Sequence, residues 1–200
     1  MNKQNSFLSK TEILDAAEQT LRRFGPDKTS VTDVAKLLGV SHGTLYRHFP
    51  SKAALREAVT ERWLEEKIIA PLIEIANTES ESEAPLRQVR QYILKLIELK
   101  HSYAEEDPEM FKMYASVTAE AADLVDAHIG CIVKHLSLII SRGIEHKSIQ
   151  RISEPDAMAR SIFQATTGFH HPAHAYGWRN ASTQEDFNFL WLLIEQGLAV

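Results

Sequence analysis

The stretch from residue 30 to residue 52 constrains the fold of this chain most strongly, because its pattern is that of two short helices joined by a tight turn. In the first part, apolar Val31, Val34 and Leu38 recur at spacings of three and four, so one helical face can be buried. Gly39 stands where this periodicity stops, a position that favours a positive φ. Ser41 can then cap a second helix. The pattern predicts a helix-turn-helix.

The second helix, over about residues 42–48, has two clearly different faces. Leu45 and Phe49 are four residues apart and are expected to point inward together. The opposite face carries small or hydrogen-bonding residues, with the two histidines nearer its edges: Gly43, Thr44, Tyr46, Arg47, His42 and His48. A short helix with such an outer face fits the DNA major groove.

The charge distribution agrees with a nucleic-acid partner although the total charge is −5. Residues 1–56 carry nine Lys and Arg against five Asp and Glu, a net charge of +4. Residues 57–200 carry thirteen against twenty-two, a net charge of −9. Since steering depends on the local field, the N-terminal part is the expected site of phosphate contact.

Several protein classes are not indicated by the sequence. Cys131 is the single cysteine, so no intramolecular disulfide can form. The polar N-terminus does not resemble a secretory signal, and no apolar run approaches the length of a membrane span. No phosphate-binding glycine loop, nucleophile elbow or zinc-protease motif is present. We expect a cytoplasmic protein that is not an enzyme, has no cofactor and does not contact a membrane.

Helical periodicity continues through the rest of the chain, without sustained β alternation. Apolar stripes begin after the capping-box pattern Ser9–Glu12, after Ser51, and at Pro85, and a long helix is expected over about 118–146. We therefore predict an all-α fold of about nine helices. Residues 1–56 form the predicted DNA-binding domain, and residues 57–200 form a larger predicted C-terminal domain.

The last helical pattern is apolar on more than one face, which predicts burial on more than one side. One face can pack on its own domain and another on a second subunit. The stripe expected at a two-fold dimer interface consists of four residues: Phe187, Leu190, Trp191 and Ile194. The alternative is a central core helix.

The run from Thr32 to Lys52, followed by Leu55, closely resembles the TetR/AcrR family of bacterial transcriptional regulators. The close resemblance covers about residues 9–65, and the rest of the chain agrees in the number and order of its helices. It implies a homodimer that binds double-stranded operator DNA and releases it when a small-molecule effector occupies the C-terminal domain.

The resemblance also implies roles for single residues. Positions that contact DNA in the family are matched here by Thr32, Ser41, Gly43, Thr44, Tyr46, His48 and Lys52. His42 and Arg47 stand at variable positions, and an arginine pairs well with guanine. We therefore assign base choice to His42, Thr44 and Arg47, and phosphate contact to Thr32, Tyr46, His48 and Lys52.

The effector site is less clearly marked. Candidate lining residues, drawn from several helical patterns, are Ile93, Phe111, Tyr114, His128, Phe163 and Thr167. Aromatic residues at helical spacing are more often ordinary core residues than residues of a ligand site. A cluster at His170, His171 and His174 allows an alternative, a metal-sensing regulator, although few carboxylates accompany it and we assign no metal site. A second alternative is a helical ligand-binding protein that does not contact DNA.

Overall fold

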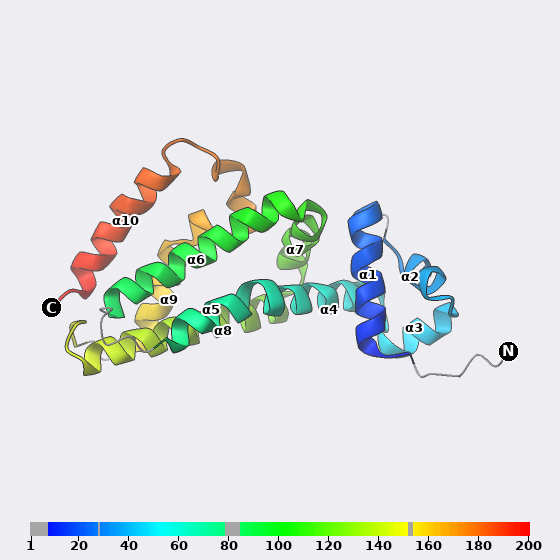
Figure 1. Ribbon diagram of the computed structural model, residues 1–200, viewed down its shortest axis with the longest axis horizontal. Helices are drawn as coiled ribbons and strands as arrows, with labels where there is room; N and C mark the ends of the chain where they lie inside the picture. Colours follow the sequence, from blue (N-terminus) through cyan, green and yellow to red (C-terminus); the bar gives the residue numbers. More distant parts are fainter. Residues whose placement is uncertain (1–7, 28, 79–84, 152–153) are drawn as a thin grey trace. The chain divides into compact units, whose positions relative to one another are not determined.

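The computed structural model describes residues 8–27, 29–78, 85–151 and 154–200, and these ranges contain ten α-helices and no strand (Figure 1). The predicted all-α fold is confirmed. The α-helices are α1 Lys10–Phe24, α2 Val31–Leu38, α3 His42–His48, α4 Lys52–Leu64, α5 Ala70–Asn77, α6 Pro85–Glu106, α7 Pro108–Glu120, α8 Ala122–Glu145, α9 Pro155–Ala165 and α10 Thr183–Leu198. Three shorter helical turns are η1 Glu65–Ile69, which is a π-helix, and the 3₁₀ turns η2 Thr167–Phe169 and η3 Pro172–Gly177.

The helix that follows Ser51 does not continue as a regular α-helix into α5. Between α4 and α5 the backbone widens into η1, and the N–H of Ala70 bonds the oxygen of Glu65, five residues earlier. Pro71 has no N–H and cannot continue the regular ladder of hydrogen bonds. The resulting segment, α5, brings the total in the described residues to ten α-helices instead of about nine.

The predicted long helix over 118–146 begins later than expected. Residues 118–120 belong to α7, and Ala121 breaks the helix with φ −112° and ψ 77°. The N–H of Ala121 closes α7 on the oxygen of Val117, and α8 starts at Ala122. Both segments are apolar at helical spacing, so periodicity alone did not locate this break.

The chain forms two compact units. The first comprises Met1–Arg62 and Asp107–Ala121, and the second comprises Trp63–Glu106 and Ala122–Val200. The first unit therefore differs from the expected domain, residues 1–56, because it also contains the end of α4 and all of α7. Met113 of α7 lines an apolar pocket with Leu21 of α1 and Val59 of α4. Because Met113 is buried against these helices, α7 belongs to the first unit although it is distant from α1 and α4 in the sequence.

The core of the first unit is made by the apolar stripes that define the helices. Ile13 and Leu21 of α1, Val34 of α2, and Leu45 and Phe49 around α3 are all 3% exposed or less. Within α3 and the residue that follows it, only Leu45 and Phe49 are buried. The other side chains of α3 therefore lie outside this core.

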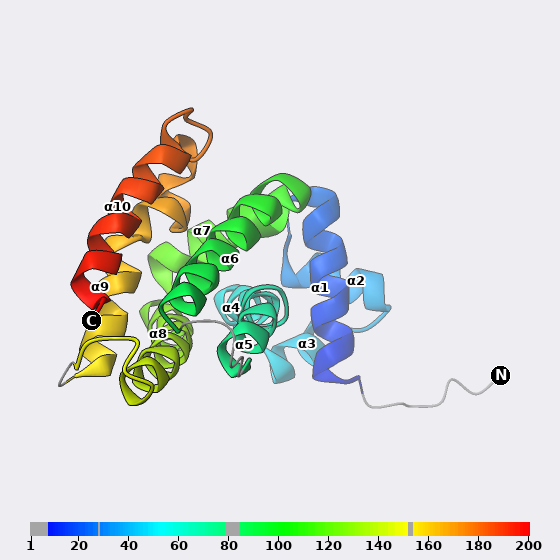
Figure 2. The same ribbon diagram turned by 60° about the vertical axis from the view of Figure 1, so that its left-hand side comes forward.

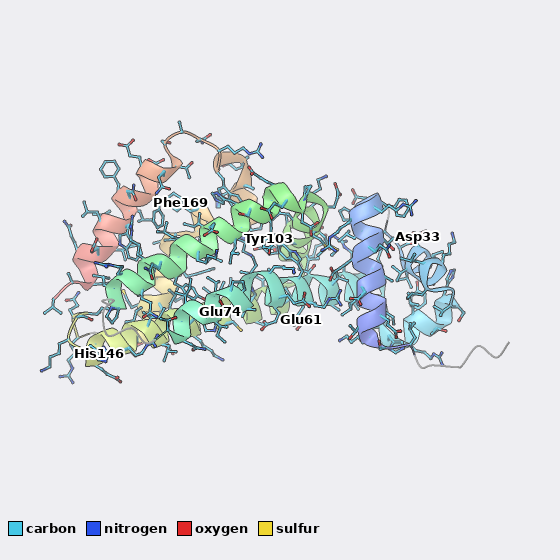
Figure 3. The ribbon with its side chains drawn as sticks, in the orientation of Figure 1. Asp33, Glu61, Glu74, Tyr103, His146 and Phe169 are labelled. Carbon is cyan, nitrogen blue, oxygen red and sulfur yellow. The ribbon has the colours of Figure 1, made fainter. Side chains whose placement is uncertain are left out.

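The second unit is built around α6, α8 and α9. Helix α8 packs along α9 and against α6 (Figure 1 and Figure 2). Leu96 of α6, Leu136 and Ile140 of α8 and Ala159 of α9 have no exposed surface. At the start of this unit the ring of Trp63 meets that of Tyr103, labelled in Figure 3, edge to face with 5.4 Å between centroids. By length and apolar character α8 alone among the described helices could cross a membrane, but its apolar stripe packs on α6 and α9.

Candidate nucleic-acid interface and effector site

The turn before α3 is fixed by local hydrogen bonds. Ser30 and Asp33 form a capping box at the start of α2, in which the N–H of Asp33 donates to the Ser30 hydroxyl oxygen at 3.2 Å (Asp33 is labelled in Figure 3). The hydrogen bond from the Ser30 hydroxyl lowers the pKa of the Asp33 carboxyl. Gly39 ends α2 with φ 66° and ψ 31°, the left-handed conformation predicted for it.

Ser41 caps α3, as predicted. The N–H of Thr44 donates to the Ser41 hydroxyl oxygen at 3.3 Å, and the side-chain oxygens of the two residues are 3.0 Å apart. Two side chains expected to contact DNA therefore bond each other and also hold the first turn of the helix.

Helix α3 exposes the face expected to meet DNA. Its exposed residues are His42, Gly43, Tyr46, Arg47 and His48, and Thr44 is half-buried. Tyr46 is 51% exposed, so half of this large side chain is accessible to a partner. A Cβ added at Gly43 would meet only the Ser41 hydroxyl oxygen, at 3.8 Å. The fold itself therefore does not require glycine at this position.

The two expected phosphate contacts outside α3 lie near helix starts. Thr32 is half-buried in the first turn of α2, and exposed Lys52 is the first residue of α4. The N–H of Ala54 donates to the Ser51 hydroxyl oxygen at 3.0 Å, which fixes the start of α4. Free N–H groups at helix starts attract anions, so both positions suit phosphate oxygens.

The positive charge of the first unit is local. Across the whole unit eleven Lys and Arg face ten Asp and Glu, a net charge of +1, because α7 and the end of α4 add mainly acidic residues. Between Asp33 and Glu57, however, the sequence contains four basic residues and no acidic residue. The field that could attract phosphate is therefore concentrated around α3 and the start of α4.

Two arginines of this unit, Arg22 and Arg62, form ion pairs. Arg62 of α4 bonds Asp15 at 2.7 Å and also Glu18, both on α1. Arg22 bonds Glu18 at 3.1 Å and Asp107 at 3.0 Å. These pairs link α1 to α4 and to the residue that precedes α7, so Arg22 and Arg62 stabilise the packing of these elements.

The six expected effector-site residues do not all lie in the same unit. Phe111 and Tyr114 are on α7 in the first unit, where their rings meet with 5.7 Å between centroids. The other four are in the second unit: Ile93 on α6, His128 on α8, Phe163 on α9 and Thr167 on η2. The hydroxyl of Thr167 donates to the oxygen of Phe163 at 3.2 Å, so these two belong to one local structure.

A basic cluster in the second unit adds Lys100 on α6, which the sequence interpretation missed, to His128 on α8 and to His170, which follows η2. The sequence interpretation named His128 and His170, but in two separate candidate sites. Lys100 is 1% exposed and His170 is 3% exposed. Burial lowers the pKa of His128, and the charges of Lys100 and His170 lower it further. A signal was available, because Lys100 lies four residues after Leu96 and continues the apolar stripe of α6.

Polar neighbours hold His170 in this cluster. Its Nε2 lies 3.2 Å from the hydroxyl of Thr166, which is itself fully buried and donates to the oxygen of Ile162 at 2.9 Å. His101, the residue after Lys100, donates to the oxygen of Phe169 at 2.9 Å. Phe169, labelled in Figure 3, thus joins the segment of His170 to α6. Burial and then the charge of Lys100 lower the pKa of His170 to about 3.

The histidines proposed as a metal site have separate environments. His170 is buried beside Thr166, whereas His174 is exposed, and the chain from residue 167 to residue 177 forms 3₁₀ turns instead of an α-helix. His171 and His174 have ring centroids 6.0 Å apart. Among the described residues no group of three or more His, Cys, Asp or Glu is placed to hold a metal ion.

The exposed apolar face of α10 is not the one we expected. Phe187 and Trp191 are 2% and 4% exposed, and Phe187 packs on Phe169 with 5.4 Å between ring centroids. These two residues therefore belong to the interior of their own unit, while Leu190 and Ile194 are half-buried. The exposed apolar side chains lie on the other face: Phe189, Leu192 and Leu193.

Comparisons with known proteins agree with this organisation. A curated relative, the nucleoid occlusion factor SlmA of Marinomonas sp. (strain MWYL1), is 32% identical over 120 residues, which cover 60% of this chain and 54% of the relative. The HTH-type transcriptional regulator RutR of Escherichia coli (strain K12) is 36% identical over 96 residues, covering 48% of this chain and 43% of the relative. The chain spans about half the length of the curated relatives it matches.

Solved structures and family models extend the match to the full fold. The structure of SmeT, the repressor of the Stenotrophomonas maltophilia multidrug efflux pump SmeDEF, has a TM-score of 0.65 at 16% identity and covers 96% of this chain and 91% of its own. The family model described as bacterial regulatory proteins, tetR family, matches residues 13–59. The model of the tetracyclin repressor-like C-terminal domain matches residues 85–191. The chain belongs to the TetR family of DNA-binding regulators.

Proposed function

We propose that this chain is a ligand-responsive repressor that acts in the cytoplasm as a homodimer and releases its operator when a small molecule binds the second unit. The observation that carries the proposal is the two-sided character of α3. Leu45 and Phe49 anchor the helix, while Gly43, Tyr46 and Arg47 are exposed beside it. A rigid helix with hydrogen-bonding groups on its outer face can read base edges in the major groove.

The proposed contacts divide into two groups. His42, Thr44 and Arg47 read bases, and Gly43 lets the backbone approach the groove. Thr32, Ser41, Tyr46, His48 and Lys52 contact phosphates and set the position of α3. Phosphate contacts contribute affinity that falls with salt, whereas base contacts determine sequence preference.

Release follows from a shift between conformations of the dimer. Two α3 helices must reach successive major grooves about 34–36 Å apart. An effector that binds more tightly to conformations with another spacing lowers the population that can bind DNA. Helix α4 contributes residues to both compact units, so it is the proposed connection. The proposal assigns the chain no catalytic step.

The dimer is proposed to form through α10. Phe189 is 63% exposed and Leu193 is 68% exposed on this helix. Apolar side chains of this size on one helical face favour contact with a second copy about a two-fold axis. The proposed interface therefore moves from Phe187 and Trp191 to the face of Phe189, Leu192 and Leu193.

The experiment that tests the function is recovery of DNA from the organism's own genome. The purified full chain is mixed with sheared genomic DNA, and retained fragments are sequenced. We expect a small set of sites upstream of genes, with a shared two-fold symmetric sequence. Retention of all fragments alike would contradict the proposal.

The 32% sequence identity to the nucleoid occlusion factor SlmA supports a second candidate function, in which DNA binding serves nucleoid occlusion. Recovery of genomic DNA together with deletion of the gene separates the two. A repressor is expected at few sites next to promoters, and deletion of its gene should raise transcription of the neighbouring genes. Nucleoid occlusion instead predicts that deletion leaves transcription unchanged and allows division across the nucleoid.

A further inference from the structure

We propose that the first unit contains a ligand site of its own, an apolar pocket with two cations that binds a small organic anion such as a short-chain carboxylate. The pocket lies among α1, the start of α2, α4 and α7, and every residue that lines it belongs to the first unit. This site is separate from the effector site proposed in the second unit, and its existence does not depend on that proposal.

The pocket is lined mainly by hydrocarbon. Its apolar lining consists of six side chains that are also buried in the core of the unit: Ala17, Leu21, Val31, Leu55, Val59 and Met113. The space between them is about 300 Å³ including the open mouth, and the closed end is narrow. This volume is at the lower limit for small-molecule sites, so the pocket admits only a short or branched hydrocarbon group.

Two cations of α4, Lys52 and Arg56, line the same pocket and determine the charge of its ligand. They are four residues apart, so they lie on one face of the helix and repel each other. Neither forms an ion pair within the described part of the chain, whereas Arg62 on the same helix bonds both Asp15 and Glu18. No acidic residue is among those that line the pocket. An anion would therefore be attracted by both charges and would relieve their repulsion.

The guanidinium of Arg56 also has a hydrogen-bond donor to spare. Its Nη2 donates to the hydroxyl oxygen of Ser116 on α7 at 2.9 Å, and that hydroxyl donates to Glu120 at 3.3 Å. Its Nε is buried and forms no hydrogen bond within the described residues. A buried polar atom without a partner is costly, more so in a charged group. A carboxylate oxygen bound beside Arg56 would supply the acceptor, while Ser116 holds the guanidinium in position.

Binding at this site is expected to compete directly with DNA. Lys52 is exposed and is one of the residues proposed to contact a phosphate. An anion held by Lys52 and Arg56 occupies positive charge that a DNA phosphate would otherwise use. The first unit would then respond to a small anion without any change in the spacing of the two α3 helices in a dimer.

The test follows the four methionines of the full chain by NMR, after labelling their methyl groups with carbon-13. Met113 lines the pocket, whereas Met158 lies on α9 in the second unit. Propionate, isobutyrate and isovalerate are titrated at constant ionic strength, each beside its uncharged primary amide. We expect at least one carboxylate to shift the Met113 signal without shifting that of Met158, and to bind about fivefold or more tightly than its amide.

Two variants separate the charge of Arg56 from its contact with α7. Arg56→Met should weaken the carboxylate by about fivefold or more and leave the amide unchanged. Ser116→Ala removes the hydrogen bond but keeps the charge, so it should retain the preference for the carboxylate. Arg160→Met is the matched control, since Arg160 is an exposed arginine on α9, and should bind like the wild type. If Arg56→Met does not fold, the comparison of carboxylate with amide on the wild type still decides the question.

The inference is overturned if no carboxylate of the series shifts the Met113 signal, or if each amide binds as well as its carboxylate. It is also overturned if Arg56→Met keeps the preference for the carboxylate, or if Ser116→Ala loses it to the same extent as Arg56→Met. These outcomes need no DNA, so they do not bear on the proposed function.

Competition is measured with a genomic fragment that the protein retains. At equal ionic strength the bound carboxylate should weaken DNA binding more than chloride or the amide does. Carboxylate binding that leaves DNA affinity unchanged would contradict the competition. Absence of specific DNA binding by the ligand-free protein would contradict the proposed function, and the NMR titration would still decide whether the anion site exists.

Discussion

The side-chain oxygens of Ser41 and Thr44 lie 3.0 Å apart at the start of α3, and the same Ser41 oxygen accepts the N–H of Thr44. Ser41 therefore acts on the stability of α3 before any DNA is bound. Replacing it with alanine should lower the free energy of unfolding by about 1 kcal/mol. Urea unfolding measures this loss. Ser182→Ala is the control, because Ser182 precedes α10 without a side-chain capping bond, and it should change stability by less than about 0.5 kcal/mol.

Gly43→Ala separates the needs of the fold from those of DNA binding. A Cβ at this position meets no atom closer than 3.8 Å, and alanine favours the helical conformation. We expect stability to rise by about 0.5–1 kcal/mol, while affinity for a retained genomic fragment falls, because the added methyl group faces the groove. Unfolding measurements test the predicted rise in stability, and fluorescence anisotropy tests the predicted fall in DNA affinity. Equal DNA affinity in the variant would show that the backbone at Gly43 does not approach DNA closely.

Stability should fall in mild acid because of the buried histidines. The pKa of His170 is lowered to about 3 by burial and by Lys100, whereas an unfolded chain binds this proton near its ordinary value of about 6.5. Between these two values the unfolded state binds more protons, so stability decreases as pH falls, by up to about 1.4 kcal/mol per pH unit for one such histidine. Urea unfolding at a series of pH values measures the slope.

His170→Gln should reduce that slope, whereas His174→Gln should not, because His174 is exposed. An unchanged slope in His170→Gln would mean that His170 is accessible to protons in the folded protein.

The exposed face of α10 should govern the oligomeric state. Phe189→Asp and Leu193→Asp place a charge in the proposed interface and are expected to raise the dimer dissociation constant by about tenfold or more. Tyr176→Asp is the control, since Tyr176 is 86% exposed on η3, outside that helix. Sedimentation velocity measures the change. Dimers of unaltered stability in both α10 variants would place the interface elsewhere.

The sequence predicted most of the first unit because its signals are local. Ser41 caps α3, Gly39 adopts the left-handed conformation, and Leu45 and Phe49 are buried, all as their spacing predicts. Each of these outcomes depends on hydrogen bonds or helical faces within a few residues.

Long-range packing is what the sequence did not reveal. The membership of α7 in the first unit depends on Met113, which lines a pocket with residues more than fifty positions earlier. On α10 the aromatic stripe could have faced a second subunit or the same unit, and only the contact between Phe187 and Phe169 distinguishes the two. Lys100 was overlooked because a charged residue in an apolar stripe is usually interpreted as its end.

Arg47 and Lys52 provide the most direct test of the central claim, that Arg47 is one of the residues that read bases whereas Lys52 is one of those that contact phosphates. The measurement is the dissociation constant for a recovered genomic site and for a scrambled duplex, over a range of salt concentrations. Lys52→Ala should weaken both duplexes alike and reduce the salt slope by about one, whereas Arg47→Ala should cost about 1–3 kcal/mol on the recovered site and little on the scrambled one. Equal, uniform losses from both substitutions, or equal affinity of the wild type for both duplexes, would contradict the account.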